Sequence, residues 1–237
     1  FPLPLANTGN GVLLWQADAR SGLGEPAALE TPARNLIPGK DKAFATNTLV
    51  PFNAGPDAET QSLPWADGFE SGRWSDAWFG TFGTGKSEVT DATAGEGTYS
   101  FHYYGQSENG HFEGIYQLFE PSQPVFFSFR IKGTAIADAH GYVTLGDRSN
   151  HHIMWFFNTG TGFWSQTEYP DGHASLPADP DRWYHIECRD IDWQARTFHY
   201  FVDGEMLKAD IPFRNDYITS IERLDLYNFS RETEAWW

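Results

Sequence analysis

Carboxyl side chains are densest in the stretch "WYHIECRDIDWQARTFHYFVDG" (183–204), which contains Glu187, Asp190 and Asp192. Two carboxyls roughly 5 to 9 Å apart can cleave a glycosidic bond, one as an acid and the other as a base or nucleophile. Sandwich enzymes of this kind place such acids alternately on one strand, but here Arg189 occupies the position where a second acid is needed. Strand alternation predicts that Glu187 points to one face and both aspartates to the other. The spacing disfavours a glycoside hydrolase and is typical of a hairpin with an acidic turn.

A polysaccharide lyase would need different groups from the same region. It requires a base, such as histidine or tyrosine, and a cation that neutralises a uronate carboxylate. The candidate lyase residues are His185, Glu187, Arg189 and His199, with Arg130 and Tyr116 on strands that could lie nearby. The alternative interpretation is a polar strand face whose charges satisfy one another.

Carbohydrate recognition is better supported by "GDRSNHHIMWFFNTGTGFWSQTEY" (146–169). Flat aromatic rings contact the C–H surface of a sugar, and amides or imidazoles bind its hydroxyls. Alternate residues of this segment must enter a core, so only part of its aromatic content is available for a ligand. The candidate ligand-binding residues are Trp155, Trp164, Asn150, His151 and Gln166.

Composition excludes several classes of partner. The chain has 16 Lys and Arg against 32 Asp and Glu, a net charge of −16, and no basic cluster, so we expect no nucleic-acid binding. No apolar run approaches the roughly 20 residues of a membrane span, so we expect no membrane insertion. The single cysteine, Cys188, excludes an internal disulfide and a cysteine-based zinc site, and its strand position predicts a buried thiol. Because the chain begins at Phe1, we interpret it as a mature or excised piece.

The elements that must position these residues are short strands. From Trp65 onward, β-branched and aromatic segments alternate with turn signals, and no helix-length apolar stripe appears. The predicted strands cover residues 98–105, 112–120, 124–132, 141–147, 151–158, 162–168, 182–191, 197–204 and 218–230. This pattern predicts an all-β, two-sheet antiparallel β-sandwich over residues 65–237. Residues 1–64 are rich in Pro, Gly and Ala and are interpreted as an irregular N-terminal arm or linker, with one possible strand in 11–19.

Three stretches resemble a known superfamily. The hairpin 183–204, the run "ADGFESGRWSDAW" (66–78) and the end "LDLYNFSRETEAWW" (224–237) are similar to laminin G-like, concanavalin A-like jelly-roll domains. The resemblance covers roughly residues 66 to 237 and implies a jelly-roll sandwich. It also implies a calcium ion with Glu70 and Asp67 as ligands. Lectins, adhesion modules, glycoside hydrolases and polysaccharide lyases share this fold, so the resemblance does not select an activity.

We therefore predict a non-catalytic carbohydrate-binding domain of a secreted or cell-surface protein, in a larger extracellular bacterial chain. Its expected partner is a polysaccharide or other glycan. The alternatives are a polysaccharide lyase, before a hydrolase, on the same fold, or an adhesion domain that contacts protein.

Overall fold

The computed structural model describes residues 12–15, 59–74, 78–81, 86–104, 113–134, 140–159, 162–166, 174–176, 179–228 and 234–237. These residues form strands and turns but no helix. Accordingly, the described part of the chain contains no helix of the length and apolar character needed to cross a membrane.

The strands are β1 (Val12–Trp15), β2 (Trp65–Asp67), β3 (Phe79–Thr81), β4 (Lys86–Thr90), β5 (Ser100–Tyr104), β6 (Glu113–Ser122), β7 (Phe126–Gly133), β8 (His140–Gly146), β9 (His152–Thr159), β10 (Gly162–Gln166), β11 (Ala174–Leu176), β12 (Tyr184–Asp192), β13 (Thr197–Val202), β14 (Glu205–Pro212), β15 (Ile221–Asn228) and β16 (Glu234–Trp236). All nine segments predicted from the periodicity contain a strand.

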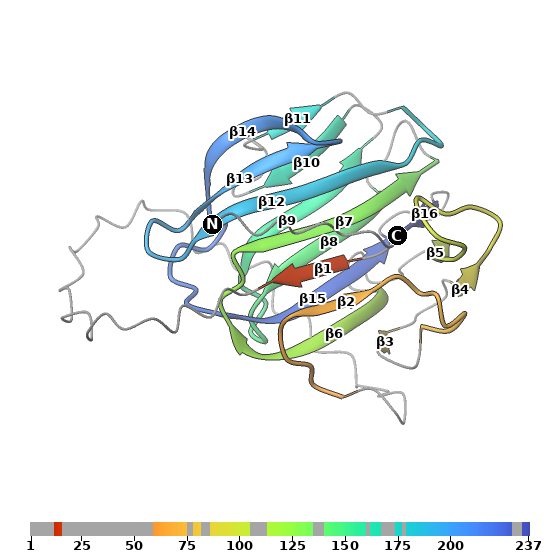
Figure 1. The fold of residues 1–237 in the computed structure, drawn as a ribbon, viewed down its shortest axis with the longest axis horizontal. Helices are drawn as coiled ribbons and strands as arrows, with labels where there is room; N and C mark the ends of the chain where they lie inside the picture. Colours follow the sequence, from red (N-terminus) through yellow and green to blue (C-terminus); the bar gives the residue numbers. More distant parts are fainter. Residues whose placement is uncertain are drawn as a thin grey trace.

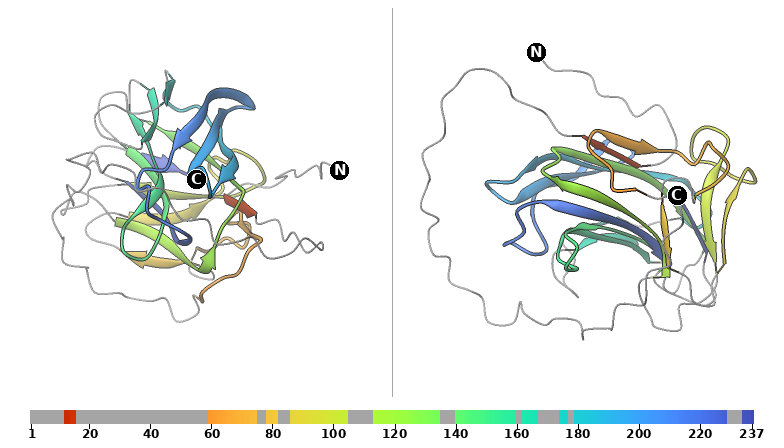
Figure 2. Two further views of the ribbon diagram at one scale, coloured as in Figure 1. Left: turned by 90° about the vertical axis from the view of Figure 1, so that its left-hand side faces the viewer. Right: turned by 90° about the horizontal axis from the view of Figure 1, so that it is seen from below.

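Two antiparallel sheets form the sandwich. Sheet A has the order β14-β13-β12-β7-β16-β5-β4; in addition, β1 pairs with β7, and β2 pairs with β1. Sheet B has the order β11-β10-β9-β8-β15-β6-β3. In Figure 1, β12 and β7 of sheet A lie in front of β9 and β8 of sheet B, and Figure 2 shows the two layers from other sides. The predicted two-sheet β-sandwich of jelly-roll type is confirmed.

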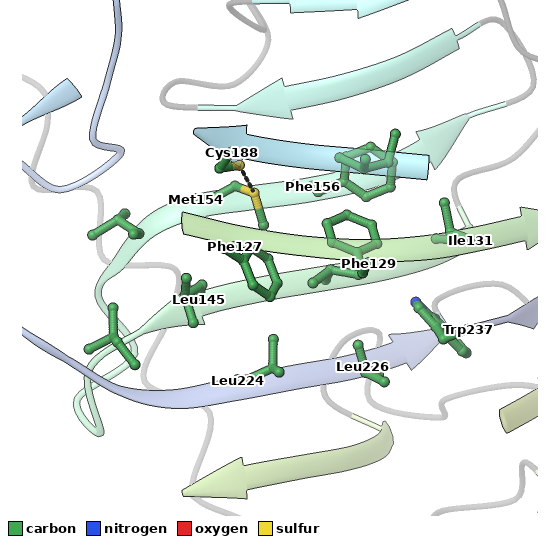
Figure 3. Close-up of a cluster of buried hydrophobic side chains, with 14 of the residues drawn as sticks. Phe127, Phe129, Ile131, Leu145, Met154, Phe156, Cys188, Leu224, Leu226 and Trp237 are labelled. Atoms are coloured by element: carbon green, nitrogen blue, oxygen red, sulfur yellow. Dashed lines mark hydrogen bonds between the residues drawn. The ribbon is translucent and has the colours of Figure 1, made fainter. Parts of the chain in front are cut away.

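The core lies between the sheets because alternate residues of each strand point inward. On β7, Phe127, Phe129 and Ile131 are fully buried. Phe129 meets Phe156 of β9 edge-to-face, with the ring centroids 5.0 Å apart (Figure 3). Each such buried aromatic or aliphatic side chain stabilises the fold by roughly 1.5–3 kcal/mol.

Cys188 belongs to this core. It is buried, and its Sγ lies 3.3 Å from Sδ of Met154 (Figure 3). Burial raises the pKa of the Cys188 thiol far above its ordinary value. The thiol is therefore a packing group, as the sequence predicts, and not a nucleophile.

One strand lies inside the region that we interpret as an irregular arm. β1 pairs antiparallel with β7 on one side and with β2 on the other (Figure 1). The possible strand in 11–19 is confirmed at Val12–Trp15. Gln61 also bridges to Phe119, so residues just before Trp65 contact sheet B. The rest of residues 1–58 lies outside the described part of the chain.

A β-bulge in β12 changes the face of the sheet to which the residues after Arg189 point. The register with β13 shifts between Arg189 and Asp192, and Asp190 has a positive φ of 52°. The extra residue lets Ile191 enter the core while Asp190 and Asp192 are exposed. The prediction that both aspartates point to the face opposite Glu187 is wrong. Asp192 instead accepts hydrogen bonds from the backbone N–H groups of Gln194 and Ala195 in the turn.

Candidate functional site

The four candidate lyase residues lie together on the outer face of sheet A. Glu187 and Arg189 form a two-pronged ion pair at 2.8 to 3.2 Å, in which the Glu187 side chain is 7% exposed and that of Arg189 38% exposed. His185 Nδ1 lies 3.9 Å from the Glu187 carboxylate. His199 stands opposite Arg189 in the β12–β13 register and accepts a hydrogen bond at Nδ1 from the backbone N–H of Asp210. The Arg189 guanidinium is therefore engaged by a protein carboxylate.

Two further residues named with this set divide between the sheets. Arg130 is directly opposite His185 in the β12–β7 register and forms an ion pair with Glu96 at 2.7 Å. Tyr116 lies on β6 in sheet B, so the expectation that it could join His185 is wrong. Burial, the largest effect, lowers the pKa of His185, which therefore carries a neutral imidazole at neutral pH.

The outer face of sheet B carries a continuous row of aromatic and basic side chains. The ring of Tyr142 stacks on Tyr227 at 4.8 Å and meets Trp155 edge-on at 6.2 Å. The Arg214 guanidinium lies 4.5 Å from the centre of the Trp155 ring. These residues come from β8, β9, β15 and the connection before β15, which the sheet order brings side by side.

The row continues across β15 to β6. The Arg223 guanidinium lies 4.3 Å from the centre of the Tyr116 ring and donates through Nε to Asp225 Oδ1 at 2.8 Å. Thr144 donates to the other oxygen of Asp225 at 3.0 Å. Because it is bound on both sides, the Asp225 carboxylate fixes Arg223 against Tyr116.

Burial and the two arginines control the titratable groups on this face. The pKa of His152 is lowered to about 3, mainly by burial and then by Arg214, Arg223 and His151. Burial raises the pKa of Tyr227 well above its ordinary value and is also the largest effect raising that of Tyr116. At neutral pH the histidine is therefore neutral, and both tyrosines keep their protons.

Among the described side chains, the accessible part of this face is one corner, formed by the turn 147–151 and the connection 213–217, which we name the Arg214 loop. Asp147 accepts hydrogen bonds from the backbone N–H groups of Ser149 and His151 and lies 2.8 Å from His151 Nδ1. The His151 ring meets Tyr217 edge-to-face, with the centroids 5.0 Å apart. Tyr217 is 53% exposed.

The Arg214 loop is held on the start of β9 by backbone hydrogen bonds. The backbone N–H of Arg214 donates to Ile153 O at 3.0 Å, and that of Asn215 donates to His152 O at 2.9 Å. The His152 N–H in turn donates to Asn215 Oδ1 at 2.8 Å. This pairing places the Arg214 guanidinium over Trp155 and keeps Tyr217 beside His151.

The residues proposed as ligand contacts divide between this corner and the rest of sheet B. Asn150 is exposed, with a positive φ of 66°, and His151 is half-buried, both in the turn of the corner. Trp155 lies on the same face but is only 5% exposed, so it supports Arg214 more than it offers a free ring. Trp164 and Gln166 belong to β10, and the β9–β10 register pairs Gln166 with Trp155; their side chains lie outside the described part of the structure.

Two residues of the corner are absent from the sequence-based candidates. Arg214 and Tyr217 come from the polar connection "RNDY", which has no strand period, so nothing local showed that they reach β9. The available signal was compositional, because an aromatic residue in a polar loop is a common feature of binding sites.

The calcium ligands implied by the family resemblance are already hydrogen-bonded. Glu70 accepts backbone N–H groups of Thr98 and Tyr99 at 3.1 and 3.2 Å. Asp67 accepts the Phe69 N–H at 2.8 Å and the Trp78 indole N–H at 2.7 Å. Among the described residues, no three His, Cys, Asp or Glu side chains gather where they could share one metal ion. Both carboxylates therefore connect neighbouring segments through hydrogen bonds, and calcium binding at Glu70 and Asp67 stays a prediction.

No known protein family matches the chain, and no curated protein sequence matches it. Solved structures with a similar course of the chain include a sialidase, with 12% identity, a TM-score of 0.48, and 63% of this chain covered. This chain spans 15% of that sialidase. The cellulose-induced protein Cip1 has 16% identity and a TM-score of 0.43, and the match covers 71% of this chain and 91% of the Cip1 chain. An endo-β-1,4-glucuronan lyase from the fungus Trichoderma reesei has 9% identity and a TM-score of 0.45, and the match covers 65% of this chain and 84% of the lyase chain. At these identities no activity is transferred from them.

Proposed function

We propose that the corner formed by the turn 147–151 and the Arg214 loop binds a carbohydrate without cleaving it. The observation that carries the proposal is Tyr217, which is the single exposed aromatic side chain among the described residues. A flat exposed ring beside an imidazole, with an exposed amide on the residue before that imidazole, matches the requirements of a sugar, whose C–H surface stacks and whose hydroxyls form hydrogen bonds. His151 and Asn150 supply those polar groups.

The protonation and pairing of the nearby groups favour binding over cleavage. His152, with its pKa of about 3, is a weak base, and the raised pKa values of Tyr116 and Tyr227 leave almost no phenolate at neutral pH. Asp225 is held by Arg223 and Thr144, so it is not placed as a free acid or base. No described pair of carboxyls on this face offers the acid and base of a glycosidase.

A lyase on the outer face of sheet A is the second candidate, and one observation favours it. His185 Nε2 is buried and finds no hydrogen-bond partner among the described residues, while Nδ1 faces the Glu187 carboxylate. An imidazole kept neutral by burial and oriented by a carboxylate has the form of a general base. The engagement of Arg189 by Glu187 weighs against it, because a lyase needs a cation for the substrate carboxylate.

The finer family assignment belongs to the same proposal. The motifs in 66–78, 183–204 and 224–237 support a laminin G-like member of the concanavalin A-like superfamily. A glycan ligand also supports a location outside the cell, either secreted or on the cell surface.

The test compares two variants in a binding assay on immobilised neutral and uronate-containing polysaccharides. Tyr217→Ala should weaken binding by about fivefold, since losing one stacking contact costs on the order of 1 kcal/mol. Met206→Ala is the matched control, because Met206 is 56% exposed and lies near the start of β14, whereas the Arg214 loop follows the end of that strand. Equal affinity of both variants, or retention of no glycan by the wild type, would remove the proposal.

A further inference from the structure

His152 connects sheet B to the Arg214 loop through both its backbone and its side chain. Its N–H and C=O each form a hydrogen bond with Asn215, as described above. His152 is 3% exposed, and the centroid of its imidazole lies 5.3 Å from that of the Trp155 ring. The Arg214 guanidinium lies over the same Trp155 ring. The His152 backbone thus holds the Arg214 loop, and its ring shares the Trp155 contact with the guanidinium of that loop.

The charged groups around this imidazole oppose a further positive charge. Arg214 acts on it from the loop, Arg223 from β15 and His151 from the preceding position. Of the nearby acids, Asp225 is paired with Arg223 and Asp147 with His151, and Asp216 lies in the Arg214 loop itself. On the two neighbouring strands, the β8 residue paired with His152 is Gly146, and β10 ("GFWSQ") carries no ionisable residue.

We infer that His152 is an acid-sensitive latch: when its imidazole takes up a proton, the Arg214 loop opens and the carbohydrate-binding corner is dismantled. The release of a glycan rests on the proposed function, whereas the opening of the loop does not. The latch would let the protein hold a glycan near neutral pH and release it in an acidic compartment or medium.

The direction of the pH effect on loop opening follows from the difference in pKa between the buried and the hydrated His152 ring. In the closed loop the pKa of His152 is about 3, whereas an imidazole exposed to water titrates near 6.5. The closed state is thus fully favoured above about pH 6.5, and acid shifts the balance toward the open state down to about pH 3. Each pH unit in this window changes the opening equilibrium by about tenfold.

Amide hydrogen exchange measures this opening without any ligand. The amides of Arg214 and Asn215, which donate to β9, report on the loop, and the Trp237 amide, which donates to Phe101 O, reports on the rest of the sandwich. Between pH 6.5 and 4.5, protection of the two loop amides, corrected for intrinsic exchange, should fall by about tenfold per unit. Protection at Trp237 should stay above that of the two loop amides at every pH, because its exchange requires the sandwich itself to open.

Two variants and one spectroscopic measurement decide the cause. His152→Gln should make loop protection independent of pH, while His199→Gln, a half-buried histidine on sheet A, should leave the acid effect intact. If His152→Gln does not fold, NMR chemical shifts of the His152 imidazole in the wild type still test the latch. The ring should remain neutral for as long as the loop amides are protected. Loop protection that is constant in acid, or a His152 ring that titrates near pH 6.5 beneath a closed loop, overturns the latch. Failure of the wild type to bind any glycan would remove the proposed function and leave the exchange result standing.

Discussion

Among the acidic residues of β12, Glu187 is expected to contribute most to stability, because it forms an ion pair with Arg189. Glu187→Gln removes the charge from a carboxylate that is 7% exposed and leaves Arg189 without its partner. The expected loss of unfolding free energy is about 1–3 kcal/mol, below the range for a fully buried pair because Arg189 is partly hydrated. Urea unfolding followed by tryptophan fluorescence measures it.

Asp190→Asn is the matched control for that change. Asp190 is exposed and has a left-handed backbone, which asparagine also tolerates, so the unfolding free energy should change by no more than about 0.5 kcal/mol. If Glu187→Gln were as neutral as Asp190→Asn, the ion pair would contribute nothing to stability.

His152 also affects the stability of the whole chain. Its folded pKa of about 3 lies below the unfolded value of about 6.5, so its contribution is present above pH 6.5 and is lost as the pH falls toward 3. The loss is at most about 1.4 kcal/mol per pH unit. The difference in unfolding free energy between pH 7.5 and 4.5 should therefore be smaller in His152→Gln than in the wild type, by roughly 2 kcal/mol. Identical pH profiles of the two proteins would mean that the ring is already hydrated in the folded state.

At the level of elements, β7 determines the packing of the two sheets. Phe129→Ala removes a fully buried ring that contacts Phe156 across the core and should cost about 3–5 kcal/mol. Phe126→Ala, on the same strand but on its half-buried outer face, should cost clearly less. Thermal or urea unfolding compares them, and equal costs would contradict the alternation on which the sandwich rests.

The calcium prediction concerns Asp67, at the end of β2, and Glu70, in the turn that follows. If Glu70 and Asp67 bind calcium, excess chelator should lower the melting temperature of metal-loaded protein, since a ligand of the native state stabilises it by mass action. Glu70→Gln should abolish that sensitivity. A melting temperature that chelator leaves unchanged, together with a lower one in Glu70→Gln, would assign Glu70 solely to its hydrogen bonds with Thr98 and Tyr99.

The strands that could be predicted are those with a clear period of two. β7 alternates phenylalanines with polar residues, and its position follows from the sequence alone. β14 was missed because its residues are mostly exposed and only Ile211 is buried, so the edge strand shows no apolar alternation. The bulge at Asp190 also escaped prediction, because an inserted residue changes the phase without changing the composition.

The candidate site could be predicted only in part, because it is assembled from distant segments. Asn150 and His151 lie in one continuous polar and aromatic stretch, which the sequence shows directly. Arg214 and Tyr217 reach the same corner through hydrogen bonds between residues more than 60 positions apart, such as His152 to Asn215. Tyr116 was considered alongside His185 because strand pairing, and hence which sheet a strand joins, is not a local property.

The whole molecule, an acidic sandwich with an aromatic corner at one end of sheet B, is proposed to bind glycans and leave them intact. The most direct test incubates the wild-type chain with soluble neutral and uronate-containing polysaccharides and follows retention and products together. Affinity electrophoresis reports retention, reducing ends report hydrolysis, and ultraviolet absorbance of an unsaturated sugar reports lyase cleavage. We expect retardation by at least one polysaccharide, reduced in Tyr217→Ala, with no products above those of a blank. Product formation that disappears in His185→Ala would contradict the account and place a catalytic site on sheet A.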